Sequence, residues 1–125
     1  MSQEHQPDHE VDRFIVDEID SVPHLEALLL FWNSRPKHWS IVDMSKALYL
    51  SDEQTGRILE DLARRKLIEH DSDQYRFSTD PELAELIERV SARYRRELVR
   101  VSNMIHSKAS PSVREFARAF RFKKD

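Results

Sequence analysis

The chain has 125 residues, of which 34% are charged, a formal net charge of −3 and no cysteine, which excludes disulfides and thiol-based metal or redox centres. Its longest apolar run, Leu25 to Trp32, is interrupted by Glu26 and is too short to span a bilayer. The polar start, MSQEHQPDHE, lacks the basic and apolar segments of a signal peptide. We therefore expect a cytoplasmic protein built on one small domain.

Charge is distributed unevenly along the chain. Residues 1–20 hold one basic and seven acidic residues, whereas residues 81–125 hold eleven basic and six acidic ones. Residues 1–10 are polar and nearly free of aliphatic side chains, which predicts a disordered acidic leader. The leader is either an ordinary solvated segment, or it folds against the basic C-terminal region until a polyanion or a partner displaces it.

Residues 11–80 are predicted to form the main domain. Phe14, Ile15, Val16 and Ile19 indicate a short packed segment, and Asp20 or Ser21 can cap a helix that ends near Ser34, ahead of a proline. The apolar face of that helix comprises Leu25, Leu28, Leu29 and Trp32. Trp39 and Ile41 then suggest a very short first strand.

Residues 40–77 are predicted to form two short helices followed by two short strands. The apolar or small residues of both helices recur at spacings of three and four, which places one stripe of each helix in a shared core. They are Ile41, Met44, Ala47, Leu48 and Leu50 in the first helix, and Thr55, Leu59 and Leu62 in the second. Between the helices, Ser51 stands at an N-cap position, where its hydroxyl can accept the backbone N–H of Gln54.

This segment resembles bacterial winged-helix regulators of the MarR, ArsR and PadR types, which commonly read T-V-x-x-L-A-x-x-L-G-L-S-x-x-T-V-x-x-x-L-x-x-L-x-x-x-G-L-V. Thr55 occupies the usual valine position, and its hydroxyl needs a partner. Tyr49 and Lys66 replace the two glycines, so we expect one or both turns to differ from the family geometry. The residues in register are Ser40, Ile41, Met44, Leu48, Leu50, Ser51, Leu59, Leu62, Leu67 and Ile68.

The resemblance implies a mainly α fold with a small β-wing, namely a winged helix-turn-helix followed by a long C-terminal helix. It also implies a transcriptional regulator whose second helix enters the major groove of double-stranded DNA. The single glycine, Gly56, lies inside that helix, where it either allows close backbone approach or is merely tolerated. The candidate DNA-binding residues are Lys46, Ser51, Gln54, Gly56, Arg57, Arg64 and Arg76.

The charges of this region keep a second function open. The second helix also carries Asp52, Glu53, Glu60 and Asp61, and the hairpin tip, HDSDQ, is acidic. Carboxylates repel the phosphates that dominate DNA affinity. The alternative is therefore a winged-helix module that binds a protein partner in signalling or transcription, without strong DNA binding.

Residues 81–109 are predicted to form one long amphipathic helix, beginning at Pro81 with Asp80 or Thr79 as its cap. Its length, about 40 Å at 1.5 Å per residue, exceeds what a small domain needs. We expect it to pair with its mate in a homodimer; the alternative is that it folds back across the first helix. The candidate partner-binding residues on its stripe are Tyr94, Leu98, Val101 and Ile105.

Residues 110–125 form a basic, Phe-rich tail. Phe116, Phe120 and Phe122 are candidate partner-binding residues, because three phenylalanines are costly to leave in water. Packing on the body or a second subunit, docking to another protein, nucleic acid and a membrane surface all remain open for the tail.

Catalysis finds little support in the sequence. The six histidines are scattered without metal-ligand spacing, and one glycine cannot build a phosphate-binding loop. No spacing suggests a Ser-His-Asp constellation. We therefore expect no enzyme activity, no cofactor and no metal.

Overall fold

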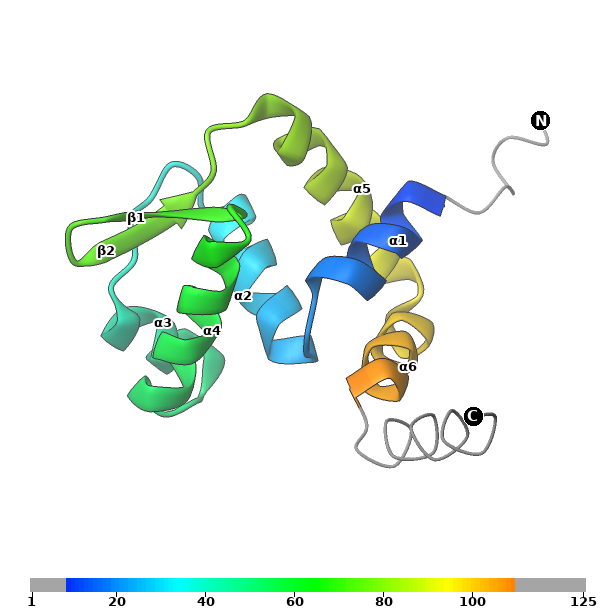
Figure 1. Cartoon of the computed structure of the whole chain (residues 1–125), viewed down its shortest axis with the longest axis horizontal. Coiled ribbons are helices and arrows are strands. Elements are labelled where there is room, and N and C mark those ends of the chain that lie inside the picture. The colour runs from blue at the N-terminus through cyan, green and yellow to red at the C-terminus, as the bar shows by residue number, and fades with distance from the viewer. Residues whose placement is uncertain (1–8, 110–125) are drawn as a thin grey trace, which may run out of the picture.

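The computed structural model describes residues 9–109 (Figure 1), which are mainly helical with a small two-stranded antiparallel sheet. The elements are α1 (His9–Glu18), α2 (Val22–Asn33), α3 (Ile41–Leu48), α4 (Asp52–Arg64), β1 (Ile68–Asp71), β2 (Gln74–Phe77), α5 (Pro81–Arg96) and α6 (Leu98–Ala109). Helix α2 is central, because it packs against α3, α4 and β2 as well as α5 and α6. Within residues 9–109, no helix combines the length and apolar character needed to cross a membrane.

The helix starts follow the capping residues that the sequence predicted. Ser21 caps α2, and Asp80 caps α5 with Pro81 in its first turn. Ser51 caps α4: its Oγ accepts the N–H of Gln54 at 3.1 Å, and the Gln54 Oε1 accepts the N–H of Ser51 at 3.3 Å. This reciprocal capping box satisfies donors at the helix start and fixes where α4 begins.

The two turns that lack glycine nevertheless keep the left-handed geometry. Tyr49 has φ 59° and ψ 43°, and Lys66 has φ 65°. The Leu50 N–H therefore reaches the Ser45 carbonyl oxygen at 3.0 Å, and the Leu67 N–H reaches that of Leu62 at the same distance. The expectation that one or both turns differ was wrong. Each non-glycine residue bears a cost of roughly 1–2 kcal/mol, because the closing bonds and the packing beyond them require this geometry.

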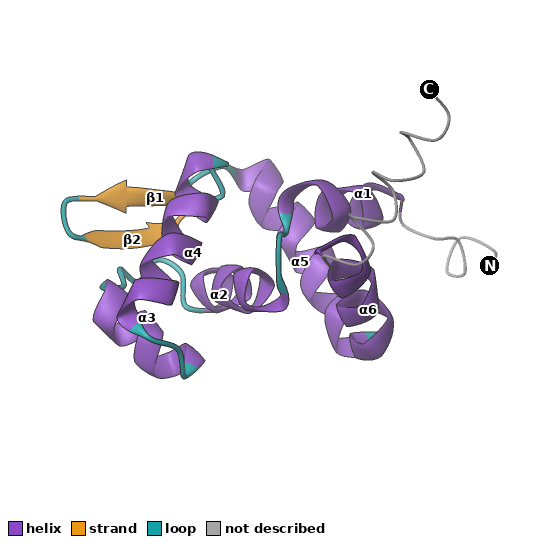
Figure 2. Cartoon of the chain, turned by 60° about the horizontal axis from the view of Figure 1, so that its bottom comes forward, coloured by secondary structure: helices purple, strands orange, loops and turns teal. Residues whose placement is uncertain are grey.

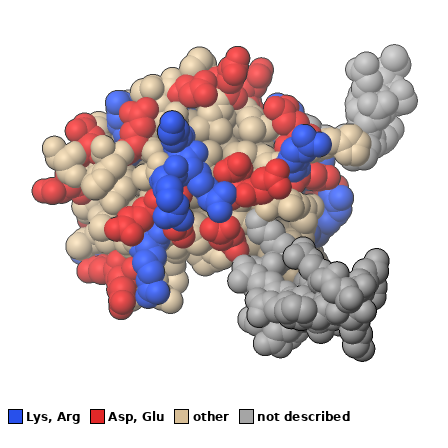
Figure 3. Space-filling model, viewed as in Figure 1, with Lys and Arg blue, Asp and Glu red and all other residues tan. Residues whose placement is uncertain are grey.

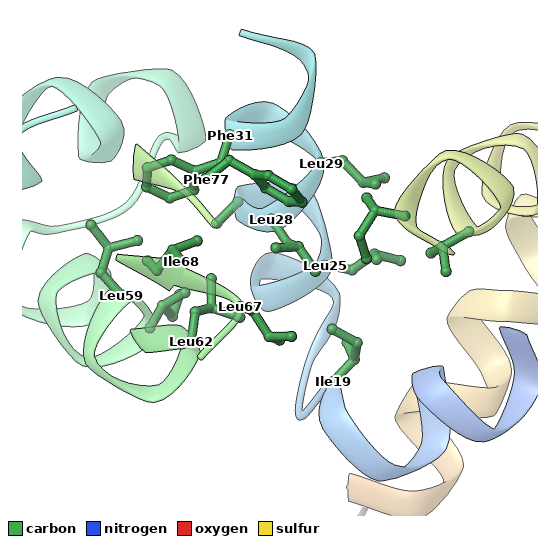
Figure 4. Close-up of a cluster of buried hydrophobic side chains, with 14 of the residues drawn as sticks. Ile19, Leu25, Leu28, Leu29, Phe31, Leu59, Leu62, Leu67, Ile68 and Phe77 are labelled. Carbon is green, nitrogen blue, oxygen red and sulfur yellow. The ribbon is translucent and has the colours of Figure 1, made fainter. Parts of the chain in front are cut away.

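The core is arranged around α2. Figure 4 shows side chains of α4, β1 and β2 gathered on one side of that helix. Leu28 and Phe31 of α2 are fully buried, as are Leu59 and Leu62 of α4. The apolar positions of α4 agree with the predicted stripe, whereas Ala47 of α3 is exposed. This packing fixes α4 with one side in the core and the other toward solvent.

The expected first strand is reduced to a single bridge. Trp39 pairs with Tyr75 of β2 through two backbone hydrogen bonds of 2.7 and 2.8 Å, whereas Ile41 already belongs to α3. Strands β1 and β2 pair antiparallel with Ile68 opposite Phe77. The bridge therefore attaches the segment before α3 to the edge of the hairpin.

The expected single C-terminal helix is divided into α5 and α6 at Glu97, which has φ −129° and ψ 52°. Val101 and Ile105 are fully buried in the chain's own core, so the expectation that they face a partner was wrong. The break lets α6 fold back, and α6 packs against α1, α2 and α5. Tyr94 is half-buried and Leu98 is 51% exposed, and a homodimer contact through them stays a prediction.

The acidic N-terminal region folds against the basic C-terminal helices through α1. Arg93, whose side chain is 7% exposed, donates to Asp12 at 2.6 Å, and Arg89 donates to Glu10 at 2.7 Å. His9 and Glu10, expected in a disordered leader, belong to α1. Residues 1–8 and the tail residues Phe116, Phe120 and Phe122 lie outside the described residues.

Candidate nucleic-acid interface

Helix α4 presents a polar side to solvent. Thr55, Ile58, Leu59 and Leu62 are buried, and the opposite side is exposed. Figure 2 shows α3, α4 and the hairpin at the end of the molecule away from α6. The exposed residues of α4 are Asp52, Glu53, Gln54, Arg57, Glu60 and Arg64.

The start of α4 brings three of the predicted DNA-binding residues together. Ser51 and Gln54 are exposed, although their side chains also form the capping box. Arg57 follows one turn later, and its guanidinium lies 3.6 Å from the Glu53 carboxylate. Both side chains of this pair are largely exposed, at 68% and 84%, so the pair stabilises the helix little and can rearrange easily.

The other predicted arginines are held more firmly. Arg64 donates to Asp61 at 2.5 Å, and Arg76 donates to Glu69 at 3.0 Å. Glu69 also accepts the N–H and the hydroxyl of Thr79; these bonds, followed by the charge of Arg76, hold the pKa of its carboxyl below the usual value. Because each guanidinium already has a carboxylate partner, part of its charge is offset before it can meet a phosphate.

Lys46 differs from these arginines. It lies exposed in the last turn of α3, and no carboxylate in residues 9–109 pairs with it. It is therefore the predicted DNA-binding cation that is most available to an outside anion.

Gly56 is half-buried, not open to solvent. A Cβ at this position would lie 3.7 Å from Cδ1 of Ile41, which is an ordinary van der Waals contact. Packing therefore does not require a glycine here, and its helical φ does not either. Close backbone approach by an outside molecule remains a prediction.

The hairpin tip adds negative charge at the same end of the molecule as α4 (Figure 2). Asp71 and Asp73 are exposed, and Ser72 between them has φ 57°. His70 stacks on Tyr75 with ring centroids 4.2 Å apart, which orders the strands behind the tip. Figure 3 shows Lys and Arg side chains in a band across one face with Asp and Glu on either side, so the charges on this face are mixed.

Sequence reasoning missed a polar network between α2 and α4. The Ser21 Oγ lies 2.6 Å from Nδ1 of His24, whose Nε2 lies 2.9 Å from Oδ2 of Asp61. The Ser21 hydroxyl also accepts the His24 N–H as the N-cap of α2. Asp61 is 37 residues away from His24, so no local pattern could have revealed the contact.

The surroundings of this network assign it a structural role. Burial opposes ionisation of Asp61, but hydrogen bonds from His24 and Arg64 outweigh it and hold the pKa of Asp61 below its usual value. Asp20, His24 and Asp61 could offer three ligand atoms to a metal ion, all within 4.8 Å of one another. However, Arg65 already donates to Asp20, and Arg64 to Asp61. The network therefore ties the start of α2 to the middle of α4.

Comparisons with known proteins assign no family. No protein-family model matches the chain, and searches of curated proteins and of solved structures find no match either.

Proposed function

We propose that residues 11–80 form a winged helix-turn-helix domain and that the protein is a regulator that binds double-stranded DNA. One observation carries the proposal: α4 is buried on one side, while its first two turns expose Ser51, Gln54 and Arg57. An exposed helix start of this kind can enter a major groove, where Gln and Arg hydrogen-bond base edges. The order of α2, the Trp39 bridge, α3, α4 and the hairpin supports the same proposal.

The carboxylates of α4 limit the affinity expected for DNA. Phosphate contacts dominate DNA binding, yet α4 carries four carboxylates and only two arginines. Arg57 can leave its exposed partner Glu53 at little cost, whereas Arg76 is half-buried with Glu69. We therefore expect weak binding that falls steeply with salt and depends on Arg57.

The test is a mobility-shift titration of the full chain on genomic DNA fragments at low ionic strength. Arg57→Ala should abolish the shift, since it removes the cation best placed for base edges. Arg96→Ala is the control, because Arg96 is also an exposed arginine but lies in the last turn of α5. No shift of the wild-type chain even at low ionic strength would sink the proposal.

A protein partner is the second candidate. It is favoured by the acidic character of α4 and of the hairpin tip, where Asp71 and Asp73 are exposed. Glu60→Lys separates the two functions, because Glu60 is exposed on α4. The substitution should strengthen binding to DNA and weaken binding to a basic protein partner, so the two candidates predict effects of opposite sign.

A further inference from the structure

Tyr49 is unfavourable for the fold in two ways. Its backbone adopts φ 59° and ψ 43°, a conformation that glycine enters without the steric penalty of a side chain. Its side chain is 93% exposed, so packing recovers none of that penalty. The turn requires the left-handed backbone, but no contact in residues 9–109 requires a tyrosine there, which points to a role of its side chain outside the chain.

Lys46 lies three residues before Tyr49 in the sequence. Lys46 lies in the last turn of α3, and Tyr49 is the C-cap residue directly after that helix. Lys46 is exposed and has no carboxylate partner within residues 9–109. One turn earlier on the same face, Val42 is 47% exposed. The C-terminal end of α3 and its cap thus expose a cation and a phenol.

We infer that the Tyr49 hydroxyl and the Lys46 ammonium contact the phosphate backbone of duplex DNA beside the start of α4. The inference rests on the proposed function. Tyr49 lies two residues before Ser51, the N-cap of α4, so it stands at the border of the proposed groove contact. A phenol donates to phosphate oxygens, and a lysine neutralises the phosphate charge.

One oxygen of the neighbouring Asp52 carboxylate already accepts a hydrogen bond. Its Oδ1 accepts the Ser45 hydroxyl at 2.6 Å, which directs that oxygen toward α3. Asp43 is exposed three residues before Lys46 within α3, a spacing that makes their side chains neighbours on the helix surface. Phosphate binding at Lys46 therefore has to overcome the negative charge of Asp43.

The test is fluorescence anisotropy of the full chain with a labelled mixed-sequence duplex, titrated over a range of salt. Tyr49→Asn should weaken binding about threefold to tenfold, because a phosphate hydrogen bond is lost. Its thermal midpoint should stay the same or rise, because Asn tolerates the left-handed conformation. Lys46→Gln should lower the salt slope by about 1.

Two controls sharpen the result. Tyr49→Phe keeps the ring and removes the hydroxyl, so it should weaken binding as much as Tyr49→Asn. Val42→Ala should leave binding unchanged, since phosphate needs no apolar contact. Equal weakening by Val42→Ala would overturn the inference in favour of an apolar protein surface.

The remaining outcomes separate the two proposals. If the wild-type chain binds the duplex and both Tyr49→Asn and Lys46→Gln bind it equally well, this inference alone is overturned. Absence of wild-type binding overturns the proposed function, and the inference with it.

Discussion

The imidazole Nε2 of His24 lies 2.9 Å from Oδ2 of Asp61, so the start of α2 is joined to the middle of α4 by one hydrogen bond. The side chains are mostly buried, with 11% and 27% exposed. Because α4 is held to α2 at this point, the bond helps to keep the buried side of α4 against the core.

Asp61→Asn should destabilise the protein by about 1–3 kcal/mol near neutral pH, because it weakens a charge-assisted hydrogen bond. The folded-state pKa of Asp61 is lowered, so its stabilising effect is present above the unfolded value, near 3.8, and is lost as the pH falls through the folded value. Urea unfolding at neutral and acid pH measures this difference. The exposed neighbour Glu60→Gln is the control, and equal stability of wild type and Asp61→Asn at neutral pH would contradict the assignment.

Thr55→Val should stabilise the protein. The Thr55 side chain is fully buried, and its Oγ1 has no hydrogen-bond partner in the part of the chain that the structure describes. Replacing the hydroxyl by a methyl group keeps the shape and removes an unsatisfied polar atom, a gain of about 1 kcal/mol. Denaturant midpoints of the two proteins check this, and a loss of stability would show that the hydroxyl has a partner.

Gly56→Ala should raise stability by about 1 kcal/mol, because alanine is the better helix former. The added methyl group meets only Cδ1 of Ile41, at an ordinary contact distance. Thermal unfolding measures the gain. If the same variant loses DNA affinity, glycine serves close approach by the ligand; a destabilised variant would mean that α3 and α4 pack more tightly than described.

Ile105→Ala should destabilise the monomer by about 2–5 kcal/mol, since Ile105 is fully buried in the chain's own core. Leu98→Ala, at a position that is 51% exposed, is the matched control and should change stability little. Chemical unfolding combined with sedimentation velocity separates a core role from a dimer contact. An Ile105→Ala protein that keeps its stability but changes its oligomeric state would restore the original dimer expectation.

Local patterns predicted the helix starts and the apolar side of α4 because those features depend on residues three or four apart. The capping box of Ser51 and Gln54 is such a case. The break at Glu97 was not predictable, because the apolar stripe continues across it without proline or glycine. It depends on how α1 packs against α5 and α6, which no local pattern records.

The candidate interface was predicted only in part. The sequence placed Gln54 and Arg57 on the exposed side of α4, as the structure does. It could not show which arginines are paired, since Arg65 meets Asp20 from 45 residues away. The sequence also predicted altered turns, yet Tyr49 keeps the left-handed geometry. Residue preference alone opposes that conformation, but the packing around a turn can impose it.

The most direct test of DNA binding through α4 is the affinity of the full chain for a labelled duplex, compared between wild type and Arg57→Ala at rising salt. We expect measurable wild-type binding at low ionic strength, a steep loss with salt, and no binding by Arg57→Ala. Equal binding by the two proteins, or no binding by the wild type at the lowest salt, would contradict the account.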